Sequence, residues 1–154
     1  MLTNLQAATL EHFGTGREAY ADARRIAGKL FDRAYSQGMW GQWWAKLSGQ
    51  PNCLNTLPRR AEAAHRTVRT VFVPLEKIVG SEGRSDDFDA NFYPLKLHNR
   101  ERWISVAAAR RTGVALPAVE LVQVGNEYYV RDGHHRISVA KAMGQMEVEA
   151  RIVN

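Results

Sequence analysis

The stretch YYVRDGHHRISVAKAMG, residues 128–144, holds more reactive side chains than any other part of the sequence. Its beginning, within EYYVRD, is aromatic and β-branched, which is typical of a strand. The segment after Gly133 reads as a helix that ends at Gly144. A glycine between a strand and a helix lets the backbone turn sharply. The stretch therefore predicts a strand that turns into a helix whose first turn carries two histidines and an arginine.

The first turn of this helix is a natural anion site. Its amides have no acceptor within the helix, and the helix dipole adds partial positive charge. The Arg136 guanidinium can grip two oxygen atoms at once, which suits phosphate. We therefore expect Gly133, His134, His135 and Arg136 to bind a phosphate group. Asp132 has two options: it caps the helix, or it holds Mg²⁺ or acts as a base beside the phosphate.

Other chemistries find less support in the sequence. Adjacent histidines diverge by about 100° on a helix, so one metal ion held by both is not expected. Cys53 is the single cysteine, which excludes an internal disulfide and a cysteine-based zinc cage. No nucleophile elbow surrounds Ser138, and no Walker-type loop occurs. A polar Asp-Gly turn without any function is also common, and this interpretation stays open.

The second half of the chain predicts an α+β domain over residues 68–154. TVFVPL is a short strand, and VGSEGRSDDFDANFYPL is a long acidic loop. NRERWISVAAARRTG reads as a helix with Trp103 facing inward and Gly113 as its stop. LPAVELVQVG and EYYVRD form a hairpin around Gly125-Asn126, and MEVEARIV is a closing strand. The order of strands and helices indicates a compact mixed domain.

Residues 1–67 predict a helical extension and a linker. Apolar positions recur at helical spacing from Arg17 to Tyr35. After SQG a second helical piece, MWGQWWAKL, carries Trp40, Trp43 and Trp44. We expect a helical hairpin with an aromatic seam. A base-stacking platform is the alternative, and it requires exposed rings.

The composition is that of an ordinary globular domain, with 45% hydrophobic and 24% charged residues among 154. No apolar run approaches the length of a membrane span, and the start lacks a signal-peptide pattern, so we expect a cytoplasmic protein without membrane contact. The net charge of +5 comes entirely from residues 1–70. This charge indicates either a solvated basic face or a surface that contacts DNA. The candidate DNA contacts on the first helix are Arg17, Arg24, Arg25, Lys29 and Arg33.

The quoted stretch, followed by VEARIV, resembles the core of the ParB and sulfiredoxin superfamily. Upstream, VFVPLEKIVGSEGR is similar to the family's opening strand and loop arginine, here Arg84. LPAVELVQVGNEYYV is similar to its strand hairpin. The resemblance covers about residues 70–153, and it implies a compact mixed-sheet domain with a phosphate or nucleotide ligand at the glycine turn.

The superfamily implies four activities. Sulfiredoxins need a cysteine where this chain has His134, so that activity is not expected. Partition proteins bind CTP and clamp DNA, but the sequence stops at Asn154 after its last strand, which favours a bare nucleotide-binding domain. Free-serine kinases carry a turn similar to Asp132–Arg136 together with an upstream acid, for which Glu82, Asp86 and Asp87 are candidates. Some ParB-like domains are nucleases.

Three hypotheses follow. The first is a domain that binds a nucleotide with Mg²⁺ and hydrolyses or transfers phosphate. In it Arg84 adds a second charge contact, and Asp132, His135 and Glu82 are the catalytic candidates, with Asp132 also the metal ligand. The second is a DNA-associated module, partition-like or nuclease, that uses the basic helices. The third is a non-catalytic interaction domain, with a homodimer through the N-terminal helices.

Overall fold

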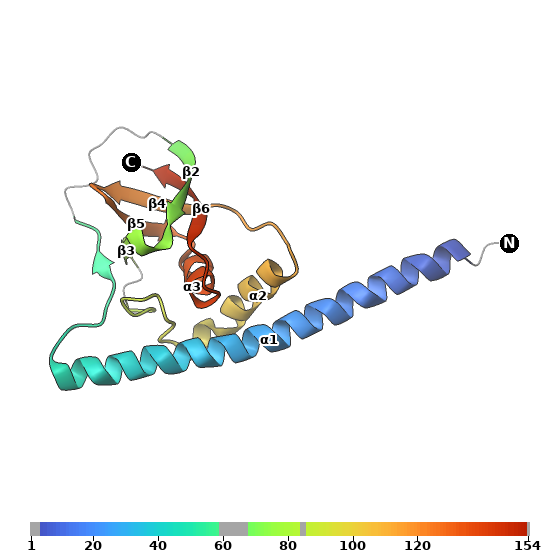
Figure 1. Ribbon diagram of the computed structural model, residues 1–154, viewed down its shortest axis with the longest axis horizontal. Coiled ribbons are helices and arrows are strands. Elements are labelled where there is room, and N and C mark those ends of the chain that lie inside the picture. Colours follow the sequence, from blue (N-terminus) through green and yellow to red (C-terminus); the bar gives the residue numbers. More distant parts are fainter. Residues whose placement is uncertain (1–3, 59–67, 84–85, 154) are drawn as a thin grey trace.

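Three helices and a six-stranded mixed sheet make up the computed structural model, which describes residues 4–58, 68–83 and 86–153 (Figure 1). The α-helices are α1 (Asn4–Ser48), α2 (Arg100–Arg111) and α3 (His134–Ala142), and the short 3-10 helices are η2 (Leu75–Lys77) and η3 (Leu97–Asn99). The strands are β1 (Asn55–Thr56), β2 (Val68–Pro74), β3 (Ile78–Ser81), β4 (Val119–Val124), β5 (Glu127–Asp132) and β6 (Glu147–Val153). The α+β class and the N-terminal helical extension are confirmed.

The sheet has the order β1-β3-β5-β4-β6-β2. β4 and β5 form the expected antiparallel hairpin around Gly125, and β2 pairs antiparallel with β6. The pairs β1–β3, β3–β5 and β4–β6 are parallel. In β6, alternate residues such as Val148 and Ala150 are buried, as the period-two pattern predicts. The closing strand lies between β4 and the edge strand β2.

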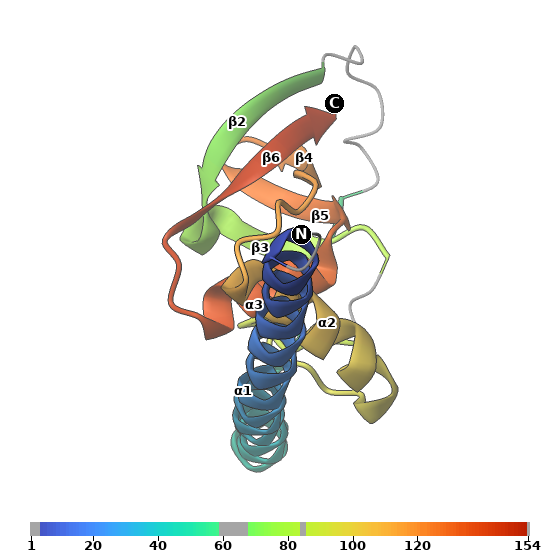
Figure 2. The same ribbon diagram turned by 90° about the vertical axis from the view of Figure 1, so that its right-hand side faces the viewer.

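The helix α3 lies between two apolar clusters, and Figure 2 shows it between the sheet and α2. Ile137 and Ala140 pack against the strands, whereas Val139 packs against α1 and α2. Trp103 of α2 donates a hydrogen bond from Nε1 to Ser138 Oγ at 2.8 Å. Burial on both sides holds this nine-residue helix, which would be too short to be stable alone.

The expected helical hairpin at the N-terminus is wrong, because α1 is one continuous helix of 45 residues. The helix continues through Ser36, whose hydroxyl donates a hydrogen bond to the backbone oxygen of Asp32 one turn earlier. Gly38 does not break the helix but permits a close contact: a Cβ there would lie 2.9 Å from Pro94 O. No proline interrupts the segment, and a lone glycine in a helix is tolerated when packing requires it.

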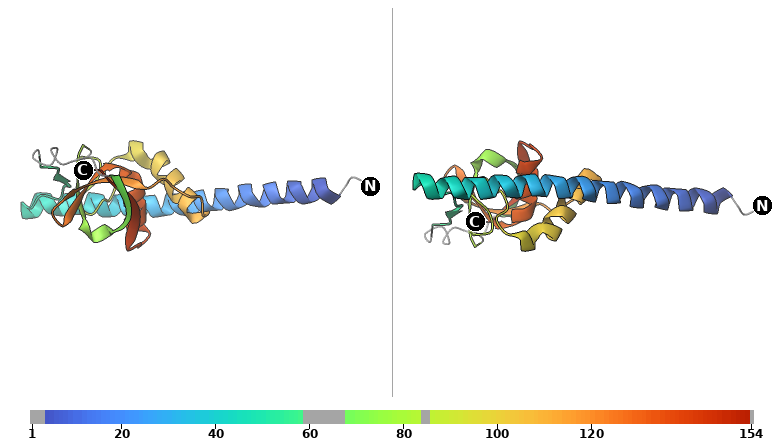
Figure 3. Two further views of the ribbon diagram at one scale, coloured as in Figure 1. Left: turned by 90° about the horizontal axis from the view of Figure 1, so that it is seen from above. Right: turned by 90° about the horizontal axis from the view of Figure 1, so that it is seen from below.

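The middle of α1 packs on α2 through small residues and Phe31. Ala23, Ala27 and Ala34 are buried, and the Phe31 ring meets Trp103 edge-on at 5.5 Å between centroids. Figure 3 shows that α1 continues beyond the sheet domain toward its N-terminal end. The extension is thus attached through its middle and, at Gly38, through the part that follows.

Two short strands were not expected. β1 lies in the predicted linker, and β3 occupies residues 78–81, where the predicted long acidic loop begins at residue 79. Both pair in parallel with neighbours that are distant in the sequence. Strands this short show no hydrophobic periodicity in the sequence. Whether such a segment forms a strand depends on the neighbours with which it pairs.

The loop between β3 and α2 is organised by a buried carboxylate. Asp89 Oδ1 accepts hydrogen bonds from the amides of Asn91 and Tyr93, and Oδ2 accepts one from Asn52 Nδ2. Burial raises the pKa of Asp89, while these three donors and the nearby Lys141 lower it. The loop carries Phe88 and Phe92 into the core beside the site described below.

Replacing this carboxylate should destabilise the fold. We expect Asp89→Ala to lower the free energy of unfolding by about 3 kcal/mol, because three partly buried N–H donors lose their acceptor. Denaturant unfolding followed by circular dichroism measures the change. Asp86→Ala, which alters an exposed carboxylate in the same loop, is the control and should differ little from the wild type. Equal effects of the two variants would contradict the role assigned to Asp89.

Candidate functional site

The predicted strand-to-helix turn is confirmed. β5 ends at Asp132, and α3 begins at His134 after Gly133, whose φ of 101° lies in the left-handed region. A Cβ at Gly133 would stand 2.6 Å from Val119 Cγ1 on the neighbouring strand. Conformation and close packing both require glycine here. The turn therefore directs the first amides of α3 to a fixed position beside β4.

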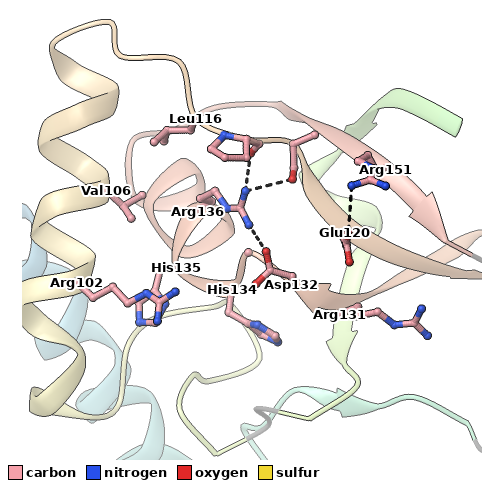
Figure 4. A pocket seen from close by; sticks show the side chains of 13 residues that line it. Arg102, Val106, Leu116, Glu120, Arg131, Asp132, His134, His135, Arg136 and Arg151 are labelled. Carbon is pink, nitrogen blue, oxygen red and sulfur yellow. Dashed lines mark hydrogen bonds and ion pairs between the residues drawn. The ribbon is translucent and has the colours of Figure 1, made fainter. Parts of the chain in front are cut away.

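Arg136 is held by the protein itself. Its Nη1 donates to the carbonyl oxygens of Pro117 at 2.6 Å and Ala118 at 3.1 Å, and its Nη2 pairs with Asp132 (Figure 4). Only 14% of the side chain is exposed. These bonds join the first turn of α3 to the segment that enters β4. Asp132 is the partner of this guanidinium, and no side chain caps the helix at Gly133.

The two histidines point in different directions from the first turn. His134 is buried, its Nε2 lies 2.7 Å from Ser81 Oγ, and its ring stacks on Phe88 with 6.2 Å between centroids. His135 meets the same Phe88 edge-on at 5.5 Å. The described part of the chain holds no group of three or more His, Cys, Asp or Glu side chains arranged for a metal ion.

A cavity of about 640 Å³ opens at the N-terminal end of α3. Its walls come from α2, the segment before β4, the three central strands and the glycine turn (Figure 4). The lining residues are Arg102, Val106, Leu116, Pro117, Ala118, Glu120, Arg131, Asp132, Gly133, His134, His135, Arg136 and Arg151. Four of the five predicted phosphate-binding residues, Gly133 to Arg136, thus line one cavity together with Asp132.

Arginine dominates the charge of this cavity. Four arginines face two carboxylates, Glu120 and Asp132, among the lining residues. Glu120 pairs with Arg151 at 3.2 Å, and Asp132 pairs with Arg136. Arg102, on α2, forms no ion pair with any residue that the structure describes. The cavity therefore has an excess of positive charge. Among the described residues, Arg102 is the cavity arginine whose guanidinium pairs with no carboxylate.

The predicted upstream acids lie outside the cavity lining. Glu82 accepts two hydrogen bonds from Arg131, at 2.7 and 3.1 Å, and so reaches the cavity only through that arginine. Asp86 is exposed and lines a different hollow, beside the end of α1. Asp87 accepts the Leu95 amide through its backbone carbonyl. Arg84 lies outside the described residues.

Sequence reasoning missed four charged cavity residues: Arg102, Glu120, Arg131 and Arg151. The sheet register brings two of them together, since Glu120 lies opposite Asp132 on β5 and opposite Arg151 on β6. The strand order is needed to see this. Arg102 could have been found from the helix pattern, because it lies one turn before Val106 on the side of α2 that adjoins the motif.

The cations of α1 have different surroundings. Arg24 turns inward, where it donates to Glu101 at 2.6 Å and Ser105 at 3.0 Å, and Arg25 pairs with Asp22. Arg17, Lys29 and Arg33 are exposed. Trp40, Trp43 and Trp44 are exposed as well, so the predicted aromatic seam is wrong. No helix in the described ranges has the length and apolar character needed to span a bilayer.

Comparisons with known proteins give one structural similarity. No family model matches the chain, and no curated protein matches it. The crystal structure of sulfiredoxin from Arabidopsis thaliana is similar, with a TM-score of 0.40 and 21% sequence identity over 55% of this chain and 83% of that one. This likeness concerns the general arrangement of the fold, and membership of the superfamily stays a prediction.

The close contact at the turn can be tested by adding one methyl group. We expect Gly133→Ala to lower the free energy of unfolding by about 3 kcal/mol, since it combines a left-handed backbone with a steric overlap. Gly144→Ala is the matched control: its φ is also positive, at 70°, but a Cβ there meets nothing within 4 Å. The control should lose only about 1 kcal/mol. Equal losses in thermal or denaturant unfolding would show that Val119 does not constrain the turn.

Proposed function

We propose that the cavity at the N-terminal end of α3 binds the phosphate groups of a nucleotide. The observation that carries this proposal is the arginine cluster, in which Arg102 has no acidic partner among the described residues. A guanidinium without a carboxylate at a helix N-terminus suits a multiply charged phosphate ligand. The cavity volume of about 640 Å³ suits a ligand of nucleotide size.

The contacts divide between two elements. The first amides of α3, from His134 to Arg136, have no acceptor within the helix and carry its positive dipole end. Arg102 comes from α2 and lines the same cavity as His135 (Figure 4). In this proposal the amides and Arg102 contact phosphate, and His135 lies between them. The ligand thereby bridges α2 and the glycine turn.

Arg136 has a supporting role in this arrangement. Its bonds to Pro117 O, Ala118 O and Asp132 hold the turn in place, and its side chain also lines the cavity. It lends positive charge to the ligand while it keeps the helix N-terminus aligned with β4. Removing it would therefore affect folding as well as binding.

A magnesium ion fits this site when a nucleotide brings it. Mg²⁺ in nucleotide sites is held by one or two carboxylates together with phosphate oxygens. Asp132 and Glu120 are opposite each other on β5 and β4, and both line the cavity. Bound there, the ion would neutralise charge that develops on the phosphates. His135 borders the ligand and would accept or donate a proton during hydrolysis or transfer, and Asp132 would do so where it does not hold the ion.

Binding can be tested with one arginine substitution. We expect nucleoside triphosphates with Mg²⁺ to raise the melting temperature of the wild type, because a ligand that binds only the folded state stabilises it. Arg102→Ala should lose most of this shift but keep the ligand-free melting temperature, since Arg102 forms no ion pair in the described structure. Arg111→Ala, on the same helix but outside the cavity lining, is the matched control. An unchanged shift in Arg102→Ala, or no shift of the wild type with any nucleotide or with pyrophosphate, would refute the site.

Turnover is a separate question with its own measurement. We expect the wild type to release inorganic phosphate from the nucleotide that stabilises it, and Asp132→Asn to lose at least about tenfold of that rate, as is usual when a general base is removed. Glu127→Gln, in the hairpin outside the cavity lining, should retain the rate. Binding without phosphate release would identify a non-catalytic nucleotide-binding domain.

A further inference from the structure

The outer face of α1 carries an exposed aromatic stripe. Met39, Trp40, Trp43, Trp44 and Leu47 fall within an arc of about 140° at 3.6 residues per turn, opposite the face that buries Ala27, Phe31 and Ala34. The three tryptophans are 68%, 52% and 65% exposed. A group of large apolar rings on the surface of a protein is typical of an interaction site. The stripe is separate from the cavity, whose lining includes no residue of α1.

The three indole rings are exposed, and none of them is stacked flat on another. Trp40 and Trp43 meet edge-on, with an interplanar angle of 85° and 5.6 Å between centroids. Trp43 and Trp44 are tilted by 45° at 6.5 Å. Flat stacking would hide the ring faces, and neither pair is stacked. More than half of each tryptophan therefore remains open to contact with a planar group.

Positively charged side chains without an ion-pair partner in the described ranges lie on the same side of α1. Lys29 and Arg33 lie within the arc of the tryptophans, about three and two turns before Trp40, and Lys46 lies at the border of the stripe beside Met39. None of the three forms an ion pair within the described ranges, whereas Asp22 and Asp32 pair with Arg25 and Arg100. The outer face thus combines exposed aromatic rings with positive charge, and the two acids nearest to Lys29 and Arg33 along this face, Asp22 and Asp32, already pair with other arginines.

We propose that this outer face of α1 docks single-stranded nucleic acid. Unpaired bases stack on Trp40, Trp43 and Trp44, and Lys29, Arg33 and Lys46 contact the phosphates along the strand. A duplex hides its base faces within its own stack, so it can use only the cations. A contact between two copies brings the same basic surface to both sides, whereas nucleic acid supplies the opposite charge.

The fourth tryptophan provides an internal reference. Trp103 is fully buried and bonded to Ser138, so a ligand on α1 leaves its emission unchanged. Titrating oligothymidylate into the full chain should quench the exposed tryptophans and leave this residual emission. Anisotropy of a labelled oligothymidylate then gives the affinity for each variant. The interaction should weaken as the salt concentration rises.

Two sets of variants separate stacking from charge. Each single substitution Trp40→Ala, Trp43→Ala or Trp44→Ala should weaken binding roughly tenfold. Lys29→Ala with Arg33→Ala should reduce the slope of log affinity against log salt by about 1.4, since two phosphate contacts are lost. Phe72→Ala on β2 removes an equally exposed ring, and Arg111→Ala removes an exposed cation on α2; both should bind as the wild type does. All these side chains are exposed, so melting temperatures should stay close to that of the wild type.

Three results would overturn the proposal. The first is unchanged affinity of the triple tryptophan variant. The second is duplex DNA bound as tightly as the single strand, which would leave the rings without a role. The third is a wild-type chain that binds no oligonucleotide at low salt but sediments as a dimer that the tryptophan substitutions dissociate. That result would assign the face to a second copy of the chain.

Discussion

The contact between Gly133 and Val119 is the constraint on which the cavity depends. Without a side chain at Gly133, the backbone can leave β5, turn through a left-handed conformation and start α3 directly against β4. This geometry fixes the direction of the helix N-terminus and brings Arg136 within reach of the Pro117 and Ala118 carbonyls. A larger residue would move α3 away from β4, and the cavity walls would no longer enclose one space.

Burial of α3 from both sides makes this arrangement rigid. The sheet covers Ile137 and Ala140, and the helices cover Val139, so the short helix has no free apolar face. The polar Ser138 enters this interior because Trp103 donates a hydrogen bond to it. An unpaired hydroxyl there would cost about 1–3 kcal/mol. Local charge is balanced in the same way, since most cavity arginines have a carboxylate partner and Arg102 is the exception in the described part.

The strong local patterns were readable from the sequence, and the long-range contacts were not. Gly133 and Gly144 bound α3 as predicted, and Gly125 formed the hairpin turn, because each follows from backbone conformation alone. Arg136 was expected in the first turn of α3, where it lies, but its two carbonyl partners and Asp132 could be found only once β4 was known to lie beside the turn. The break predicted near Gly38 failed for a related reason: a glycine that ends an isolated helix can also let Pro94 approach an unbroken one. The tryptophan spacing gave no information on which side of α1 meets the domain.

The attachment of α1 through its middle turns also sets distances. Because Ala23 to Ala34 are clamped on α2 and the helix is continuous from Asn4 to Ser48, its ends cannot move independently of the glycine turn. At about 1.5 Å per residue, the helix is a rod of roughly 65 Å. A group bound near either end of α1 would therefore lie at a fixed distance from the cavity. The helix sets this spacing in addition to packing on α2. A change in its length by a few residues would rotate and displace those ends without altering the cavity itself.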